Sequence, residues 1–117
     1  MKRLPHVAER CRYDMADRAV EAEVSRFLSL RILSMQERGA VPNYEASIAK
    51  LFTPELNQRV ARTGLRIGGL AAQVSRTAMY ARWARAYPQT VASTIAGGTS
   101  EIQRNIIATR GLGLPRG

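Results

Sequence analysis

The stretch TIAGGTSEIQRNIIATRGLGLPRG, residues 94–117, carries the densest set of local structure signals in this chain. Its two glycines, Gly97–Gly98, let the backbone take positive φ angles or approach a ligand closely. Thr99 or Ser100 then predicts a helix N-cap, because a hydroxyl there accepts hydrogen bonds from the first free N–H groups. We expect the helix that follows to cover about residues 100–110.

The expected helix has one apolar stripe, and its end is marked by a glycine. Ile102, Ile106 and Ile107 lie at helical spacing. Gly111 is expected to stop the helix in a left-handed conformation. A helix N-terminus held open at a glycine turn suits an anionic or oxyanion ligand. Taken alone, however, a Gly-Gly-Thr turn is more often a plain loop and cap.

Composition favours one soluble helical domain over residues 1–117. Hydrophobic residues make up 45% of the 117 residues and charged residues 23%, which argues against disorder. No apolar run approaches the ~20 residues that span a bilayer, and the basic start has no apolar segment typical of a secretory signal. Cys11 is the single cysteine, which fits a cytoplasmic location, and with His6 it offers no metal-ligand spacing.

The charge balance is strongly basic. The formal net charge is +9, from 18 Lys and Arg against 9 Asp and Glu. Such a surplus attracts anions, whether nucleic acid, acidic lipid or the phosphates of a cofactor. Most of it is arginine spread along the chain, so a solvated basic face is an equally good interpretation.

Helical periodicity recurs upstream of this stretch, and no strand signal is found. We expect a first helix over about 7–38, apolar on two neighbouring stripes and therefore an inner member of a bundle. One stripe is Tyr13, Ala16, Val20, Val24, Phe27 and Leu30, and the other is Val7, Cys11, Met15, Ala19 and Ala22. Residues 39–43 form a turn.

Two more helical segments precede the terminal stretch. One begins near Asn43 or Tyr44 and contains Pro54, which either kinks a single long helix, the favoured interpretation, or starts a new one. A break is expected near Gly68–Gly69. Another segment covers about 70–87 and ends or kinks at Pro88; residues 89–96 are helical or extended. Four antiparallel helices with short loops result, an all-α fold.

The terminal stretch closely resembles the C-terminal motif of the acyl-CoA dehydrogenases, flavoenzymes that desaturate acyl-CoA thioesters between the α and β carbons. Residues 45–60 look like the family's long central helix, and residues 81–87 resemble the arginine-rich helix before its terminal motif. The resemblance implies a four-helix up-and-down bundle, the family's C-terminal helical domain without its first helix. It is most similar to the actinobacterial lipid- and sterol-degrading branches.

The resemblance also implies roles for the diglycine turn. Gly97 matches a position whose backbone N–H helps hold the thioester carbonyl, with Gly98 beside it, and such contact stabilises enolate-like charge. Several members carry the catalytic glutamate at the position of Gly97, which has no side chain. No residue is therefore expected to act as the base. Thr99 and Glu101 match residues that touch FAD, although Glu101 stands where glutamine is frequent and can instead cap the helix.

A second flavin contact is implied near the middle of the chain. The family often has a glutamine followed by a glycine-rich segment that touches a neighbouring subunit's FAD. Gly69 aligns with that segment, and Arg66 replaces the glutamine. Arg66 could pair with phosphate or be solvated. The implied cofactor is FAD, shared with domains or a subunit outside this chain, and the implied partners are acyl-CoA and dehydrogenase subunits in a homo- or hetero-oligomer.

Because this resemblance covers less than a third of a working subunit, we expect an acyl-CoA dehydrogenase part that is inactive alone. The main alternative is a non-catalytic helical module that docks on full-length relatives. A remote alternative is nucleic-acid binding through residues 70–80, which have a faint helix-turn-helix look. Only seven aromatic residues are present for stacking. We therefore expect neither a nucleic-acid nor a membrane partner.

Overall fold

A computed structural model describes residues 5–74 and 78–116 and confirms the all-α prediction. It contains α1 (Pro5–Glu37), α2 (Tyr44–Val74), α3 (Ala78–Ser93) and α4 (Ser100–Ile106), followed by a π-helical turn, η1 (Ile107–Gly111). No strand occurs within these described residues. The prediction of one helix through Pro54 is confirmed, because α2 continues across it.

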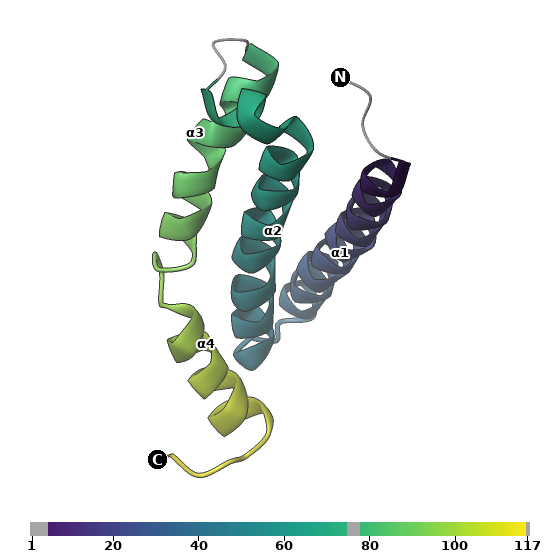
Figure 1. Ribbon diagram of the computed structural model, residues 1–117. Helices are drawn as coiled ribbons and strands as arrows, with labels where there is room; N and C mark the ends of the chain where they lie inside the picture. The colour runs from purple at the N-terminus through teal and green to yellow at the C-terminus, as the bar shows by residue number, and fades with distance from the viewer. Residues whose placement is uncertain (1–4, 75–77, 117) are drawn as a thin grey trace.

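The helices are arranged around α2. Figure 1 shows α1 on one side of α2, and α3 and α4 following one another along the other side. α2 contacts every other element, whereas α1 packs on α2 alone within the described part of the chain. The four helices therefore form an elongated molecule with extents of 55 × 27 × 23 Å.

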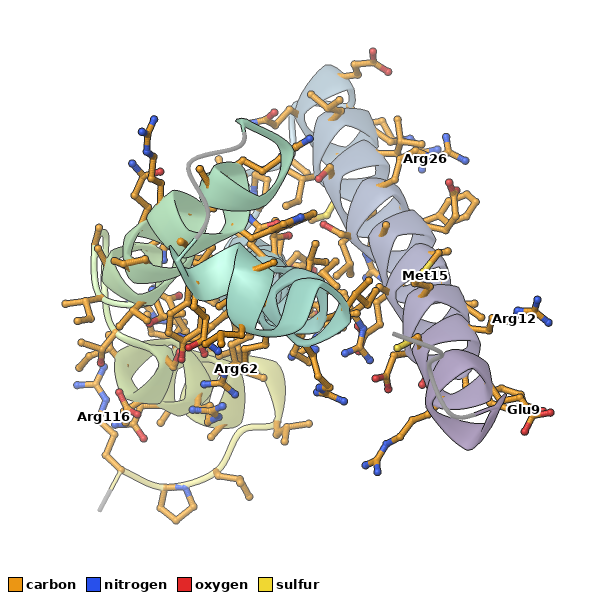
Figure 2. The ribbon with its side chains drawn as sticks, turned by 45° about the horizontal axis from the view of Figure 1, so that its top comes forward. Glu9, Arg12, Met15, Arg26, Arg62 and Arg116 are labelled. Carbon is orange, nitrogen blue, oxygen red and sulfur yellow. The ribbon has the colours of Figure 1, made fainter. Side chains whose placement is uncertain are left out.

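The predicted burial of α1 is wrong. Both apolar stripes face mainly outward: Tyr13 is 73% exposed, Val20 65% and Phe27 60%, and Met15 points away from α2 (Figure 2). Helix α1 meets α2 through a face of mixed polarity, which shares only Cys11 with the two predicted stripes. Its half-buried members include Cys11, Asp14, Arg18, Glu21, Ser25, Leu28 and Ile32. Ion pairs and a hydrogen bond hold this face against α2. The apolar stripes therefore remain mainly exposed to solvent.

The upper part of α2 bends at the predicted break. Gly69 has φ 58° and ψ −143°, so the helix is interrupted there and resumes for one short turn. The predicted break is therefore confirmed: residues 70–74 are helical beyond Gly69, α3 spans Ala78–Ser93, and residues 75–77 lie outside the described residues. Helix α3 passes Pro88 and ends at Ser93, which settles the open question over residues 89–93.

One prediction for the C-terminal helix is wrong. Gly111 does not have a positive φ; Gly113 does, at 70°. Gly111 instead allows close packing, because a Cβ there would lie 3.2 Å from the ring of Tyr44. Within the isoleucine stripe, Ile106 and Ile107 are half-buried and Ile102 is 50% exposed, whereas the neighbouring Gln103 is only 6% exposed.

Candidate functional site

The turn between α3 and α4 has the open geometry that the glycines predict. Gly97 has φ +70° and Gly98 has φ +102°, both in the region that side chains disfavour. Gly97 is exposed and Gly98 half-buried. No acceptor within the described residues reaches either amide N–H. Two neighbouring amides are therefore free to bind an acceptor atom.

The far side of the turn is fixed by α4. Thr99 is the N-cap: its hydroxyl accepts from the backbone N–H of Ile102 at 3.4 Å. The amide nitrogen of Gln103 donates to the Gly97 carbonyl at 3.3 Å. A Cβ on Gly98 would lie 2.6 Å from that same nitrogen, so glycine is needed for the close approach. The cap prediction for Thr99 is confirmed, and Gln103 is a residue that helical periodicity alone did not reveal.

A cleft of about 330 Å³ opens beside the turn, between α2 and the start of α4. Its walls carry more positive than negative charge. The lining residues are Glu55, Gln58, Arg59, Arg62, Thr94, Ser100, Glu101 and Arg104. Arg62 donates to the Tyr87 hydroxyl at 3.4 Å and to Gln58 at 3.3 Å, which holds its guanidinium at the cleft wall. The cleft suits a polar, anionic group.

A chain of ion pairs runs from the wall of the cleft to α1. Arg104 Nη2 lies 2.7 Å from Glu55 Oε1, and Arg59 lies 4.0 Å from the other oxygen of Glu55. Arg59 Nε also lies 3.1 Å from Glu21 on α1, which Arg18 approaches at 2.6 Å. The Arg18–Glu21 pair within α1 and the Arg59–Glu21 pair between α1 and α2 lack the alignment of hydrogen bonds, so charge pairing holds them. The chain ties α1, α2 and α4 together through half-exposed side chains.

Glu101 lies in the first turn of α4. Hydrogen bonds from its own backbone N–H and from the Thr99 hydroxyl, with the charge of Arg104, lower the pKa of its carboxyl. The carboxylate form is therefore favoured at neutral pH. This supports the capping alternative for Glu101 and leaves its predicted flavin contact a prediction.

The structure does not bring the two predicted flavin-contact regions together. Gly97 lies beside Lys50 near the start of α2, whereas Arg66 and Gly69 lie near the end of α2. The 16 residues from Lys50 to Arg66 correspond to about 24 Å along a helix. Arg66 also pairs with Asp14 on α1 at 2.7 Å. The two regions would serve different parts of a ligand, or different ligands.

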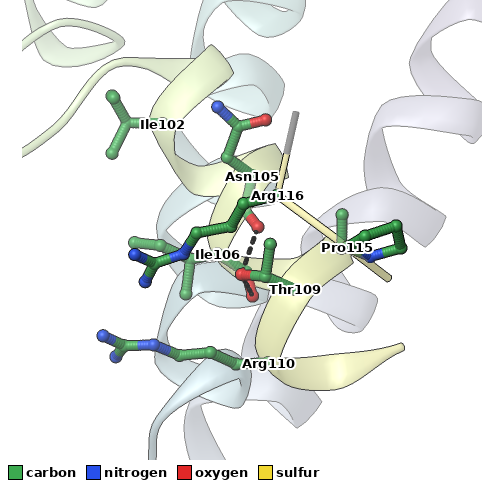
Figure 3. A pocket seen from close by; sticks show the side chains of 8 residues that line it. Ile102, Asn105, Ile106, Thr109, Arg110, Pro115 and Arg116 are labelled. Atoms are coloured by element: carbon green, nitrogen blue, oxygen red, sulfur yellow. Dashed lines mark hydrogen bonds between the residues drawn. The ribbon is translucent and has the colours of Figure 1, made fainter. Parts of the chain in front are cut away.

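A second groove, of about 420 Å³, lies on the outer side of α4 (Figure 3). Ile102 and Ile106 of α4 and Pro115 and Arg116 of the tail contribute to its lining. Arg110, which also lines the groove, donates to the Asn43 side chain at 2.8 Å and so anchors the end of η1 on the turn before α2. This groove is separate from the diglycine turn and contains none of the predicted site residues.

Comparison with known proteins decides the family. The sequence-family model described as acyl-CoA dehydrogenase, C-terminal domain, matches residues 7–112. The chain belongs to the acyl-CoA dehydrogenase family. It is 31% identical over 94 residues to acyl-CoA dehydrogenase IpdE1 of Mycolicibacterium smegmatis, covering 80% of this chain and 23% of that protein. It is 33% identical over 103 residues to FadE26 of Mycobacterium tuberculosis, covering 82% and 26%.

Solved structures agree with this dehydrogenase assignment. The structure titled Tcur3481-Tcur3483 steroid ACAD matches with a TM-score of 0.83 at 26% identity, covering 97% of this chain and 30% of that one. Its G363A variant matches with a TM-score of 0.82 at 27% identity, covering 97% and 31%. This chain spans about a quarter of the curated relatives, so it corresponds to the helical C-terminal part of a dehydrogenase.

Two further features concern the described residues. Among them no group of three His, Cys, Asp or Glu side chains could hold a metal ion. None of the described helices combines the length and apolar character needed to cross a bilayer.

Proposed function

We propose that the chain works as the C-terminal helical part of an FAD-dependent acyl-CoA dehydrogenase, in the cytoplasm, and is inactive alone. The observation that carries this is the Gly97–Gly98 turn, which has free amides and lies next to an open cleft lined by three arginines and two glutamates. Backbone amides at 2.7–3.1 Å from a developing oxyanion stabilise it strongly. The turn supplies such donors for a thioester carbonyl.

In this proposal the chain binds and polarises the substrate. The Gly97 amide donates to the thioester carbonyl oxygen, with Gly98 alongside, which draws electron density from the α carbon and acidifies its proton. Removal of that proton needs a carboxylate within hydrogen-bond reach, and Gly97 offers none. The base therefore comes from polypeptide outside this chain.

The residues at the cleft fit one side of an anionic cofactor. Three arginines line it against two carboxylates, so it attracts phosphate groups, but it forms only one wall. FAD, when bound, accepts the hydride from the β carbon. Thr99 and Glu101 are proposed to touch it from this side, and Arg66 and Gly69 to touch the cofactor of a neighbouring subunit. For Arg66 this requires phosphate to compete with Asp14.

The relatives support a substrate class and an assembly. The similar proteins are mycobacterial acyl-CoA dehydrogenases and a structure titled as a steroid ACAD. We propose a lipid- or steroid-derived acyl-CoA substrate, with dehydrogenase subunits as partners in a homo- or hetero-oligomer. The exposed stripe of α1 offers apolar surface for contact with the rest of such an assembly.

The non-catalytic docking module stays as the second candidate, because no base is found at Gly97 and because α1 exposes an apolar face. The nucleic-acid alternative rests on residues 70–80, of which 75–77 lie outside the described residues. Family membership favours a dehydrogenase over it.

The test is a complete dehydrogenase subunit bearing this C-terminal part with the substitution Gly97→Glu. A side chain there would enter the proposed thioester contact, so the rate of flavin reduction by acyl-CoA should change by about tenfold or more. Gly113→Glu is the matched control, because Gly113 has the same φ of +70° and open space around it. An unchanged rate for Gly97→Glu would remove the turn from the substrate site and favour the docking module.

A further inference from the structure

Lys50 of α2 lies beside the diglycine turn. Its ammonium Nζ donates to the backbone carbonyl of Ser93, the last residue of α3, at 3.0 Å. Its Cε lies 3.4 Å from the place that a Cβ on Gly97 would occupy. One half-buried side chain therefore binds the end of α3 and lies close to the turn.

The end of α3 shows why this contact matters. The last four carbonyls of a helix have no partner within the helix. At α3, three of them find partners nearby: the Thr90 carbonyl accepts from the Ser93 hydroxyl, the Val91 carbonyl from Thr94, and the Ala92 carbonyl from the amides of 95 and 96. The Ser93 carbonyl is the exception, because its donor is Lys50 on another helix.

The turn is therefore held at both ends by side chains that reach its backbone. Lys50 fixes the last carbonyl before it, and the Gln103 amide fixes the Gly97 carbonyl at 3.3 Å. Both glycines have positive φ and lack side chains that would stiffen them. Without these supports, the direction of the two free amides would be poorly defined.

We infer that Lys50 is a positioning residue for the Gly97–Gly98 amides. Lys50 caps α3 from the neighbouring helix α2 and so fixes the backbone where the turn begins. The free N–H groups of the turn then stay oriented toward an acceptor. The positioning itself follows from the contacts in this chain. Its consequence for turnover rests on the proposed function, in which the acceptor is the thioester carbonyl.

Hydrogen exchange of the isolated chain tests the positioning. The amides of Thr94, Ile95 and Ala96 bond to carbonyls at the end of α3, so they report on its order. Lys50→Met keeps an apolar stem and removes the ammonium, and should speed their exchange by about fivefold or more. Lys50→Arg keeps a cation of similar reach and should restore most of the protection.

The matched control is Arg110→Met. Arg110 also donates to a residue far away in the sequence, Asn43 at 2.8 Å, but it does so from η1, beyond the end of α4. Its loss should leave exchange at residues 94–96 unchanged. Equal exchange in Lys50→Met and the unsubstituted chain would overturn the inference.

The same variants in a complete subunit separate the two proposals. If the inference and the proposed function both hold, Lys50→Met slows flavin reduction by acyl-CoA by about tenfold, Lys50→Arg recovers most of the rate, and Arg110→Met leaves it unchanged. Faster exchange with an unchanged rate would support the positioning and overturn the thioester role of the turn. Unchanged exchange overturns the inference about Lys50 whatever the rate does.

Discussion

The indole ring of Trp83 on α3 occupies the space that a Cβ on Gly64 of α2 would need. All three atoms nearest to that Cβ position belong to the ring. The contact explains why a glycine lies within α2 well before its break at Gly69, since any side chain would push α3 away. Trp83 therefore packs α3 on α2.

The first prediction is that Gly64→Ala lowers stability despite the better helix propensity of alanine. Overlap with the ring should cost about 1–3 kcal/mol, measured as the free energy of unfolding in urea. In the double variant Gly64→Ala with Trp83→Leu, the smaller leucine makes room for the methyl group. The double variant should therefore lose less free energy of unfolding than the sum of the losses in the two single variants. Strict additivity would contradict the packing explanation.

A second prediction concerns the exposed stripe of α1. Phe27→Asp should leave the melting temperature nearly unchanged, because the side chain is 60% exposed, and should reduce self-association measured by sedimentation. Leu28→Asp, one residue along on the face that packs on α2, should lower the melting temperature clearly. Equal destabilisation by both changes would mean that the stripe is buried in solution.

A third prediction tests the ion pairs that Glu21 forms with Arg18 and Arg59. Glu21→Gln leaves Arg18 and Arg59 without their shared carboxylate, and should cost about 1–2 kcal/mol, less than in a fully buried pair. Because these side chains are partly solvated, added salt should reduce the difference in the free energy of unfolding between Glu21→Gln and the unsubstituted chain. A difference that is zero at low salt would show that the pairs contribute nothing to stability.

A fourth prediction follows from Glu101. Its folded-state pKa is lowered, so its contribution to stability is present above the unfolded-state pKa and is lost as the pH falls through the folded value. A carboxyl NMR titration should give a midpoint below the ordinary pKa of a glutamate side chain. Thr99→Val removes the hydroxyl donor and should raise that midpoint. A midpoint at or above the ordinary glutamate pKa in the unsubstituted chain would contradict the assignment.

The sequence predicted helices and caps well where one residue type decides local geometry. Thr99 caps α4, α2 crosses Pro54, and the break falls at Gly69. Faces were harder to predict, because burial depends on what lies opposite. The face of α1 that packs on α2 contains Asp14 and Glu21, whose charges find arginines from distant parts of the sequence.

In the candidate site, too, local features were predicted and contacts between distant residues were missed. The turn and its glycines were identified from residues 94–117, since positive φ and capping are local properties. Lys50 and Gln103 were missed, because each donates to a backbone carbonyl at the turn. Helical periodicity gives no information about such contacts. The presence of only two lysines among 18 basic residues was the one available signal for Lys50.

The most direct test of the account is the visible flavin absorbance of the purified, folded chain after incubation with FAD and removal of the free cofactor. Because this chain supplies one wall of the proposed pocket, we predict no bound flavin. A spectrum showing one flavin per chain would contradict the claim that the remaining walls belong to other polypeptide.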